Sequence, residues 1–122
     1  MNAPPDYRQF LESKVRVAPS FGISVPLEEI NPELKPFTRS IVQWAAAGGC
    51  RAIFASFGLH KTATQIELCR LLKARVGGKA LIVLPLGVRV DFFREARERF
   101  RGDFAVDLRF IRSDDEIDGD EP

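Results

Sequence analysis

Cysteine, histidine and long apolar runs are scarce in this 122-residue chain, and each scarcity excludes a class of protein. The two cysteines, Cys50 and Cys69, have no C-x-x-C spacing, which indicates free thiols in a reducing compartment. His60 is the only histidine, so a multi-histidine metal site is excluded. No apolar run approaches the roughly 20 residues that cross a bilayer. Residues 1–6 also lack the basic and then apolar order of a secretion signal, so we expect a cytoplasmic protein with no membrane partner.

The composition allows a buried core and conceals a charge asymmetry. Apolar residues make up 45% of the chain, enough for one small domain or part of a larger one. The formal net charge is +1, but residues 113–122 contain six acidic residues and no basic residue. Without this segment, 18 basic residues face 11 acidic ones, so the rest of the chain carries +7, which is compatible with nucleic acid. We expect residues 113–122 to form a solvated acidic tail.

Prolines divide the first 35 residues into short pieces. The prolines of this segment are Pro4, Pro5, Pro19, Pro26 and Pro32. We interpret residues 1–35 as an N-terminal arm with a short helix at residues 7–15 and one helical turn starting at Asn31.

Residues 36–112 alternate between helical and strand-like patterns. Helices are predicted for residues 36–47, 61–76 and 88–100, and strands for residues 51–55, 79–84 and 105–111. The side chains expected to face inward are Phe37, Ile41, Trp44 and Ala45 in the first helix and Leu68, Cys69, Leu72 and Val76 in the second. Trp44 and the phenylalanines are interpreted as packing residues rather than base-stacking platforms. The order of elements predicts an α/β fold, a parallel sheet with flanking helices.

A candidate phosphate loop lies where the first predicted strand meets the second helix, in residues 54–62 (FASFGLHKT). Backbone N–H groups at a helix N-terminus favour phosphate, Lys61 would reach the β- and γ-phosphates, and Thr62 would ligate magnesium. The predicted phosphate cradle comprises Gly58, Leu59, His60, Lys61 and Thr62. The strict pattern G-x-x-x-x-G-K-[ST] fails, because Ala55 and His60 stand at its glycine positions. An ordinary strand–turn–helix is the alternative interpretation.

Three segments, in order, resemble the motifs of superfamily 2 DEAD/DEAH-type helicases and Swi/Snf-like translocases of phage or bacterial type. They are the entry helix in residues 34–45 (LKPFTRSIVQWA), motif I in residues 55–62 (ASFGLHKT), and motif Ia in residues 79–88 (KALIVLPLGV). The resemblance covers residues 28–112 and implies the N-terminal part of a first RecA-like lobe. It also implies ATP and magnesium as ligands, and DNA or RNA as the partner of the complete motor.

The sequence departs from that family at two positions of the predicted site. Thr38 stands where the family reads adenine with glutamine, and its hydroxyl is shorter and has no amide. His60 replaces the glycine before the lysine, and its Cβ costs about 1–2 kcal/mol if the backbone must be left-handed. Three outcomes are open for His60: crowding of the phosphate, tolerance, or a useful N–H contact.

The family's catalytic Asp-Glu box and arginine finger have no counterpart in this sequence. Asp114-Asp115-Glu116 is interpreted as part of the tail, because Arg112-Ser113 separates it from the apolar strand. Arg89 and Arg94 are candidates for contact with nucleic-acid phosphate. The alternative is a solvated helix face whose acidic residues pair locally with these arginines.

The sequence thus predicts an ATP-binding, N-terminal fragment of a helicase-type, nucleic-acid-dependent ATPase that lacks the remaining motor lobes. We divide it into the arm (residues 1–35), a partial RecA-like ATP-binding lobe (residues 36–112) and the acidic tail (residues 113–122). One alternative is a degenerate or truncated P-loop module that binds no nucleotide. Another is a small P-loop kinase-like enzyme, for which neither a complete glycine loop nor an arginine-bearing lid is visible.

Overall fold

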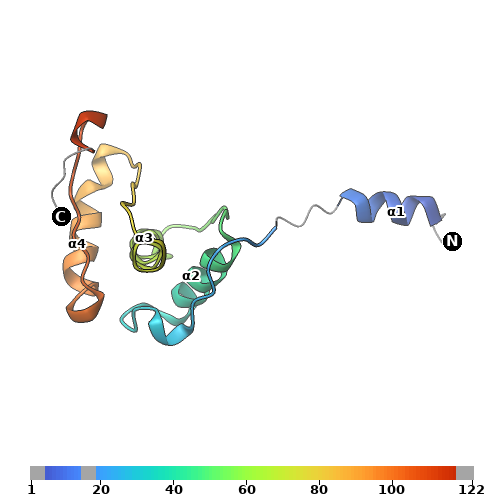
Figure 1. Cartoon of the computed structure of the whole chain (residues 1–122), viewed down its shortest axis with the longest axis horizontal. Helices are drawn as coiled ribbons and strands as arrows, with labels where there is room; N and C mark the ends of the chain where they lie inside the picture. The colour runs from blue at the N-terminus through green and yellow to red at the C-terminus, as the bar shows by residue number, and fades with distance from the viewer. Residues whose placement is uncertain (1–4, 15–18, 118–122) are drawn as a thin grey trace.

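The computed structural model describes residues 5–14 and 19–117. Its α-helices are α1 (Pro5–Lys14), α2 (Pro36–Gly48), α3 (Lys61–Val76) and α4 (Arg89–Arg99). Short 3-10 helices are η1 (Leu27–Glu29), η2 (Leu86–Val88), η3 (Gly102–Phe104) and η4 (Asp114–Glu116). Helix α3 packs against both α2 and α4, and α1 stands apart from them (Figure 1). No helix in the described ranges is long and apolar enough to cross a membrane.

The predicted α/β fold is wrong, because the described residues form helices and turns but no β-strand. Residues 51–55, 79–84 and 105–111 are extended, yet no backbone hydrogen bond joins any two of these described segments. The second and third of these segments instead pack side chains against the helical core, through Ile82, Leu84, Val106 and Leu108. A sheet would also need a neighbouring strand about 4.8 Å away. The parallel sheet of the expected RecA-like lobe is therefore absent from the described residues.

The helices themselves were predicted closely, because their ends carry strong signals. Pro36 is the first residue of α2, where its fixed φ suits the helix and its missing N–H costs nothing. Gly49 ends α2 with a φ of 83°, which favours glycine. The backbone N–H groups of Phe21, Gly22 and Ile23 then donate to the last carbonyls of α2. The N-terminal segment therefore caps this helix.

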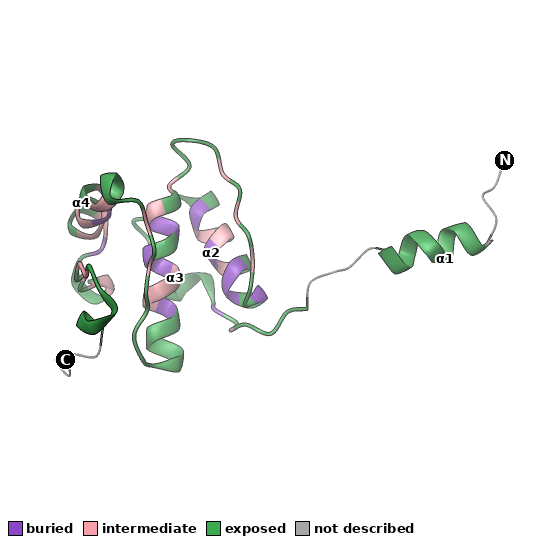
Figure 2. Cartoon of the chain, turned by 90° about the horizontal axis from the view of Figure 1, so that it is seen from above, coloured by how far each residue is buried: buried purple, intermediate pink, exposed green. Residues whose placement is uncertain are grey.

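The buried faces of α2 and α3 match the predicted ones only in part: Ala45 is buried and Leu68 packs against the core, but other predicted residues are exposed (Figure 2). Trp44 of α2 is 52% exposed and Phe37 is 39% exposed, whereas Val42 and Thr38 are fully buried. In α3, Leu72 and Val76 are exposed. The buried residues are Thr38, Val42, Ala45, Ala46 and Gly48 in α2, and Ala63, Thr64, Ile66, Glu67 and Leu71 in α3. On both helices, the face that packs against the neighbouring helices is therefore shifted by about one residue from the face that the apolar pattern predicted.

The core draws on the N-terminal segment as well as on the helices. Val25, Ile30 and Leu34 are buried, and they cluster with residues of α2, α3 and α4 and with Phe100. The arm interpretation of residues 1–35 thus omits their packing role. At the other end, residues 113–117 are exposed, as expected for the acidic tail, and residues 118–122 lie outside the described residues.

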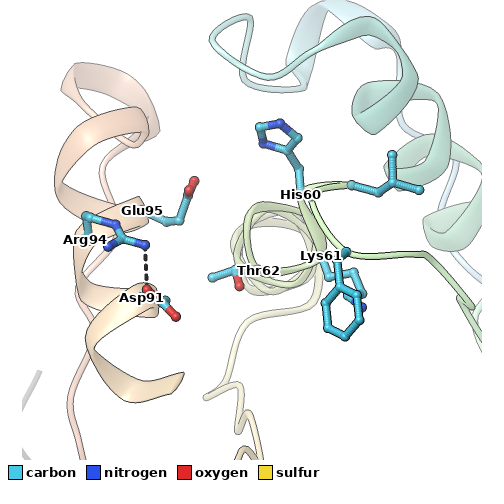
Figure 3. Close-up of a pocket in the computed structure, with 9 residues that line it drawn as sticks. His60, Lys61, Thr62, Asp91, Arg94 and Glu95 are labelled. Atoms are coloured by element: carbon cyan, nitrogen blue, oxygen red, sulfur yellow. Dashed lines mark hydrogen bonds and ion pairs between the residues drawn. The ribbon is translucent and has the colours of Figure 1, made fainter. Parts of the chain in front are cut away.

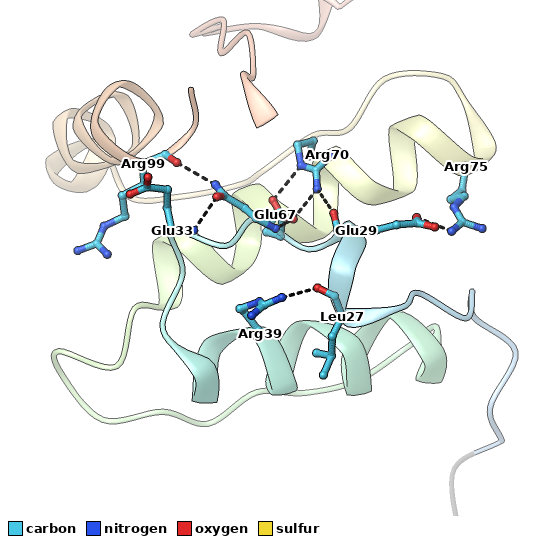
Figure 4. A network of polar contacts seen from close by, with 9 residues as sticks. Leu27, Glu29, Glu33, Arg39, Glu67, Arg70, Arg75 and Arg99 are labelled. Atoms are coloured by element: carbon cyan, nitrogen blue, oxygen red, sulfur yellow. Dashed lines mark hydrogen bonds and ion pairs between the residues drawn. The ribbon is translucent and has the colours of Figure 1, made fainter. Parts of the chain in front are cut away.

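A buried polar network ties the N-terminal segment to α3 and α4 (Figure 4). The Glu67 carboxylate is fully buried and accepts hydrogen bonds from the Asn31 backbone N–H at 2.9 Å and from the Arg70 guanidinium at 2.6 and 2.9 Å. The Asn31 side-chain amide donates to the Arg99 carbonyl at 2.8 Å, and Arg70 donates to the Glu29 carbonyl at 2.8 Å. A buried charge is strongly destabilising unless it is paired. These bonds therefore hold the N-terminal segment, α3 and α4 together.

Candidate phosphate-binding site

Helix α3 begins on a left-handed residue. His60 has φ 53° and ψ 39° and is the one non-glycine residue with positive φ among those described. Its carbonyl accepts the N–H and the hydroxyl of Thr64, both at 3.0 Å. By helix geometry the N–H groups before Thr64 have no intrahelical acceptor, and they carry the positive end of the helix dipole. This end of α3 is therefore suited to an anion.

The Lys61 side chain folds back onto the loop that precedes α3. Its Nζ donates to the Ala55 carbonyl at 2.8 Å and lies 5.4 Å from the centre of the Phe57 ring. No carboxylate among the described residues pairs with this ammonium. Figure 3 shows Lys61 and Thr62 on different sides of α3, with Thr62 toward α4. A phosphate at this helix end would therefore recruit Lys61 by a side-chain rotation that replaces the Ala55 carbonyl.

Helix α4 supplies the opposite wall of a cavity of about 500 Å³. This volume lies within the range of about 300–1,000 Å³ typical of small-molecule sites. Its α4 side chains are Asp91, Arg94 and Glu95, of which Arg94 donates to Asp91 (Figure 3). Glu95 lies 2.8 Å from the Arg99 guanidinium, measured between Oε2 and Nε. The complete lining comprises Phe57, Gly58, Leu59, His60, Lys61, Thr62, Asp91, Arg94 and Glu95.

The charges of this cavity favour a metal-bound phosphate over a bare one. Lys61 and Arg94 attract phosphate, but Asp91 and Glu95 repel it. A magnesium ion between phosphate and carboxylate removes that repulsion, and magnesium is usually bound by one or two carboxylates together with substrate phosphates. The described residues contain no group of three or more histidine, cysteine or acidic side chains that could hold a metal alone. Thr62 and Asp91 are accordingly the residues that would share magnesium with a nucleotide.

The structure brings together most, but not all, of the predicted site residues. The predicted loop residues from Gly58 to Thr62 line the cavity, and so does Arg94, which was predicted to contact nucleic acid. Thr38 does not line it: the residue is fully buried, and its hydroxyl has no hydrogen-bond partner among the described residues. Arg89 is also absent from the lining, and its guanidinium lies 4.6 Å from the centre of the Phe110 ring.

Sequence reasoning missed Asp91 and Glu95 as site residues. Both were interpreted as local partners of the arginines in their own helix, which Asp91 and Glu95 indeed contact. The available signal was their spacing of four residues, which places both on one helix face. The packing of α3 against α4 then decides that this face lies opposite Thr62.

No protein-family model, curated protein or solved structure matches the chain. The resemblance to helicases therefore depends on the three sequence motifs alone.

Proposed function

We propose that the chain binds ATP with magnesium at the N-terminus of α3, as the nucleotide-binding part of a helicase-type, nucleic-acid-dependent ATPase. The observation that supports this most strongly is the left-handed turn at His60, which starts α3 beside a cavity lined by His60, Lys61 and Thr62. Backbone donors, a lysine and a hydroxyl residue are the groups that hold the phosphates and magnesium in phosphate loops.

The expected roles follow from the placement of each group. Lys61 contacts the β- and γ-phosphates after it leaves the Ala55 carbonyl. Thr62 holds magnesium, with Asp91 as a supporting carboxylate on α4. Because Thr38 is buried, adenine is not read by its hydroxyl, and we expect little discrimination between ATP and GTP.

A degenerate module without nucleotide binding is the second candidate, and two observations favour it. The Lys61 ammonium is already satisfied by a backbone carbonyl, and two carboxylates face the cavity. Both features weaken the binding of an anion that arrives without magnesium. The two candidates therefore make opposite predictions for ATP in the presence of magnesium.

Calorimetric titration with ATP and magnesium separates these candidates. We expect Lys61→Ala to bind at least tenfold more weakly than the wild type, because a hydrogen bond to a charged group contributes about 1.5–3 kcal/mol. Lys73→Ala is the matched control, since Lys73 is an exposed lysine in the last turn of the same helix. We expect chelation of magnesium, or Thr62→Ala, to weaken binding as well. Equal binding by the Lys61→Ala variant and the wild type would reject this site, and no binding by either would support the degenerate module.

A further inference from the structure

Two exposed aromatic side chains and an arginine lie at the C-terminal end of α2. Trp44 is 52% exposed and Phe21 is 65% exposed, although both were expected to pack inside. The Arg51 guanidinium lies over the Trp44 ring, with its central carbon 5.5 Å from the ring centre. We call these three residues the α2-end cluster.

Arg51 is held in place by neutral oxygens. Its Nη1 donates to the carbonyls of Cys50 and Pro19 at 3.0 and 3.4 Å, and its Nη2 donates to the Ser20 hydroxyl at 3.0 Å. No carboxylate among the described residues forms an ion pair with it. The guanidinium is thus oriented while its charge is not neutralised, which leaves it available to an anionic ligand.

Close backbone packing fixes the position of the Phe21 ring. Phe21 and Gly22 donate backbone N–H groups to the carbonyls of Gly48 and Ala47. A Cβ on Gly22 would lie 1.8 Å from the Ala46 carbonyl oxygen, so only glycine fits there. The Phe21 ring lies against Gly49, where an added Cβ would come within 2.7 Å of it. Phe21 is therefore preorganised by the same contacts that cap α2, and the Trp44 ring lies under the oriented Arg51 guanidinium.

We infer that the α2-end cluster is a stacking surface for the bases of a single-stranded nucleic acid. Exposed rings beside a cation suit a polymer that carries both aromatic faces and phosphates, and each stacked base contributes about 1–3 kcal/mol. A purely apolar protein partner would leave the Arg51 charge without a counterpart. The inference supplies the nucleic-acid partner of the proposed function, but its residues are separate from those at the α3 cavity.

Trp44 makes the test direct, because it is the only tryptophan in the chain. We expect titration with an unlabelled oligothymidylate or oligouridylate to quench its fluorescence, and the binding constant to fall with rising salt. Arg51→Ala should bind at least tenfold more weakly, and Arg51→Lys should recover only part of the loss, because lysine keeps the charge without the flat stacking face. Phe10→Ala is the matched control: Phe10 is an exposed ring with the Lys14 ammonium 4.5 Å from its centre, on the distant helix α1.

Several results would overturn the inference. Circular dichroism first establishes that each variant folds; if Arg51→Ala does not fold, Phe21→Ala takes its place with the same expected loss. Absence of quenching, equal loss in Phe10→Ala, or equal affinity for a duplex would each reject the stacking surface. So would quenching that depends only on protein concentration, which would instead indicate self-association. Lys61→Ala separates the two proposals, because it should lose ATP while keeping the oligonucleotide.

Discussion

Replacement of His60 tests the left-handed start of α3, on which the proposed phosphate site depends. We expect His60→Gly to be more stable than His60→Ala. The left-handed backbone at φ 53° costs an L-residue about 1–2 kcal/mol and costs glycine nothing. The greater freedom of glycine in the unfolded chain opposes this by about 0.5–1 kcal/mol. The expected net advantage of glycine over alanine is therefore about 0–1.5 kcal/mol, with a central value of about 0.75 kcal/mol.

Comparing the two variants with each other removes the contribution of the imidazole. In the wild type, the His60 and Phe37 rings lie edge-on with centres 5.9 Å apart, and both variants lose this contact. In an ordinary helical or extended conformation the order would reverse, because glycine is then about 0.5–1 kcal/mol less favourable than alanine. The sign of the difference thus reports the backbone conformation at this residue.

Urea unfolding, followed by the fluorescence of Trp44, measures the difference in free energy. A higher midpoint for His60→Ala than for His60→Gly, at equal slope, would refute the left-handed turn. We also expect His60→Gly to bind ATP with magnesium more tightly than the wild type does, because it removes a side chain that lines the cavity. Weaker binding would indicate a direct contact between the imidazole and phosphate.

Three further measurements address the core, the thiols and catalysis. Glu67→Ala should lower the free energy of unfolding by about 3–5 kcal/mol, because it leaves the largely buried Arg70 guanidinium without its ion-pair partner. Glu29→Ala removes one side of an exposed ion pair and should lower it by at most about 1 kcal/mol. Equal losses in urea unfolding would contradict the network. Burial raises the pKa of the Cys69 thiol, so alkylation at pH 8 should modify exposed Cys50 first and Cys69 slowly until urea is added; a single fast phase would contradict this. The wild type should release phosphate from ATP no faster than the Lys61→Ala variant, with or without nucleic acid. This sequence shows no arginine finger, a group that alone contributes on the order of 10³–10⁵ in rate. Turnover that depends on Lys61 would show that a catalytic group was overlooked.

The helices could be predicted from the sequence because their boundaries are local. Pro36 at the start of α2, and Gly49 and Gly77 at the ends of α2 and α3, mark helix ends through backbone preferences that act over a few residues. The position of Lys61 and Thr62 directly after a turn likewise identified the helix end that lines the cavity. These signals need no knowledge of what the helix packs against.

The sheet and the buried helix faces depend on partners, and local patterns misjudged both. The apolar run in residues 79–84 and the alternation in residues 105–111 predicted that both would be extended, which they are, but not whether another strand would lie beside them. In α2, Trp44 is more apolar than Thr38, yet packing against α3 buries Thr38. Asp91 became a site residue for the same reason, because only the contact between α3 and α4 places it opposite Thr62.

The Glu67 network has a consequence for the order in which the chain folds. Two of its bonds join Asn31 to residues that are 36 and 68 positions away in sequence, so these two form only after long loops have closed. Helix α3 alone would hold the Glu67 charge in water, and its burial requires the N-terminal segment to arrive. Long-range contacts of this kind slow folding relative to a simple helical bundle. A growing chain therefore completes this core only when the residues around Arg99 are available.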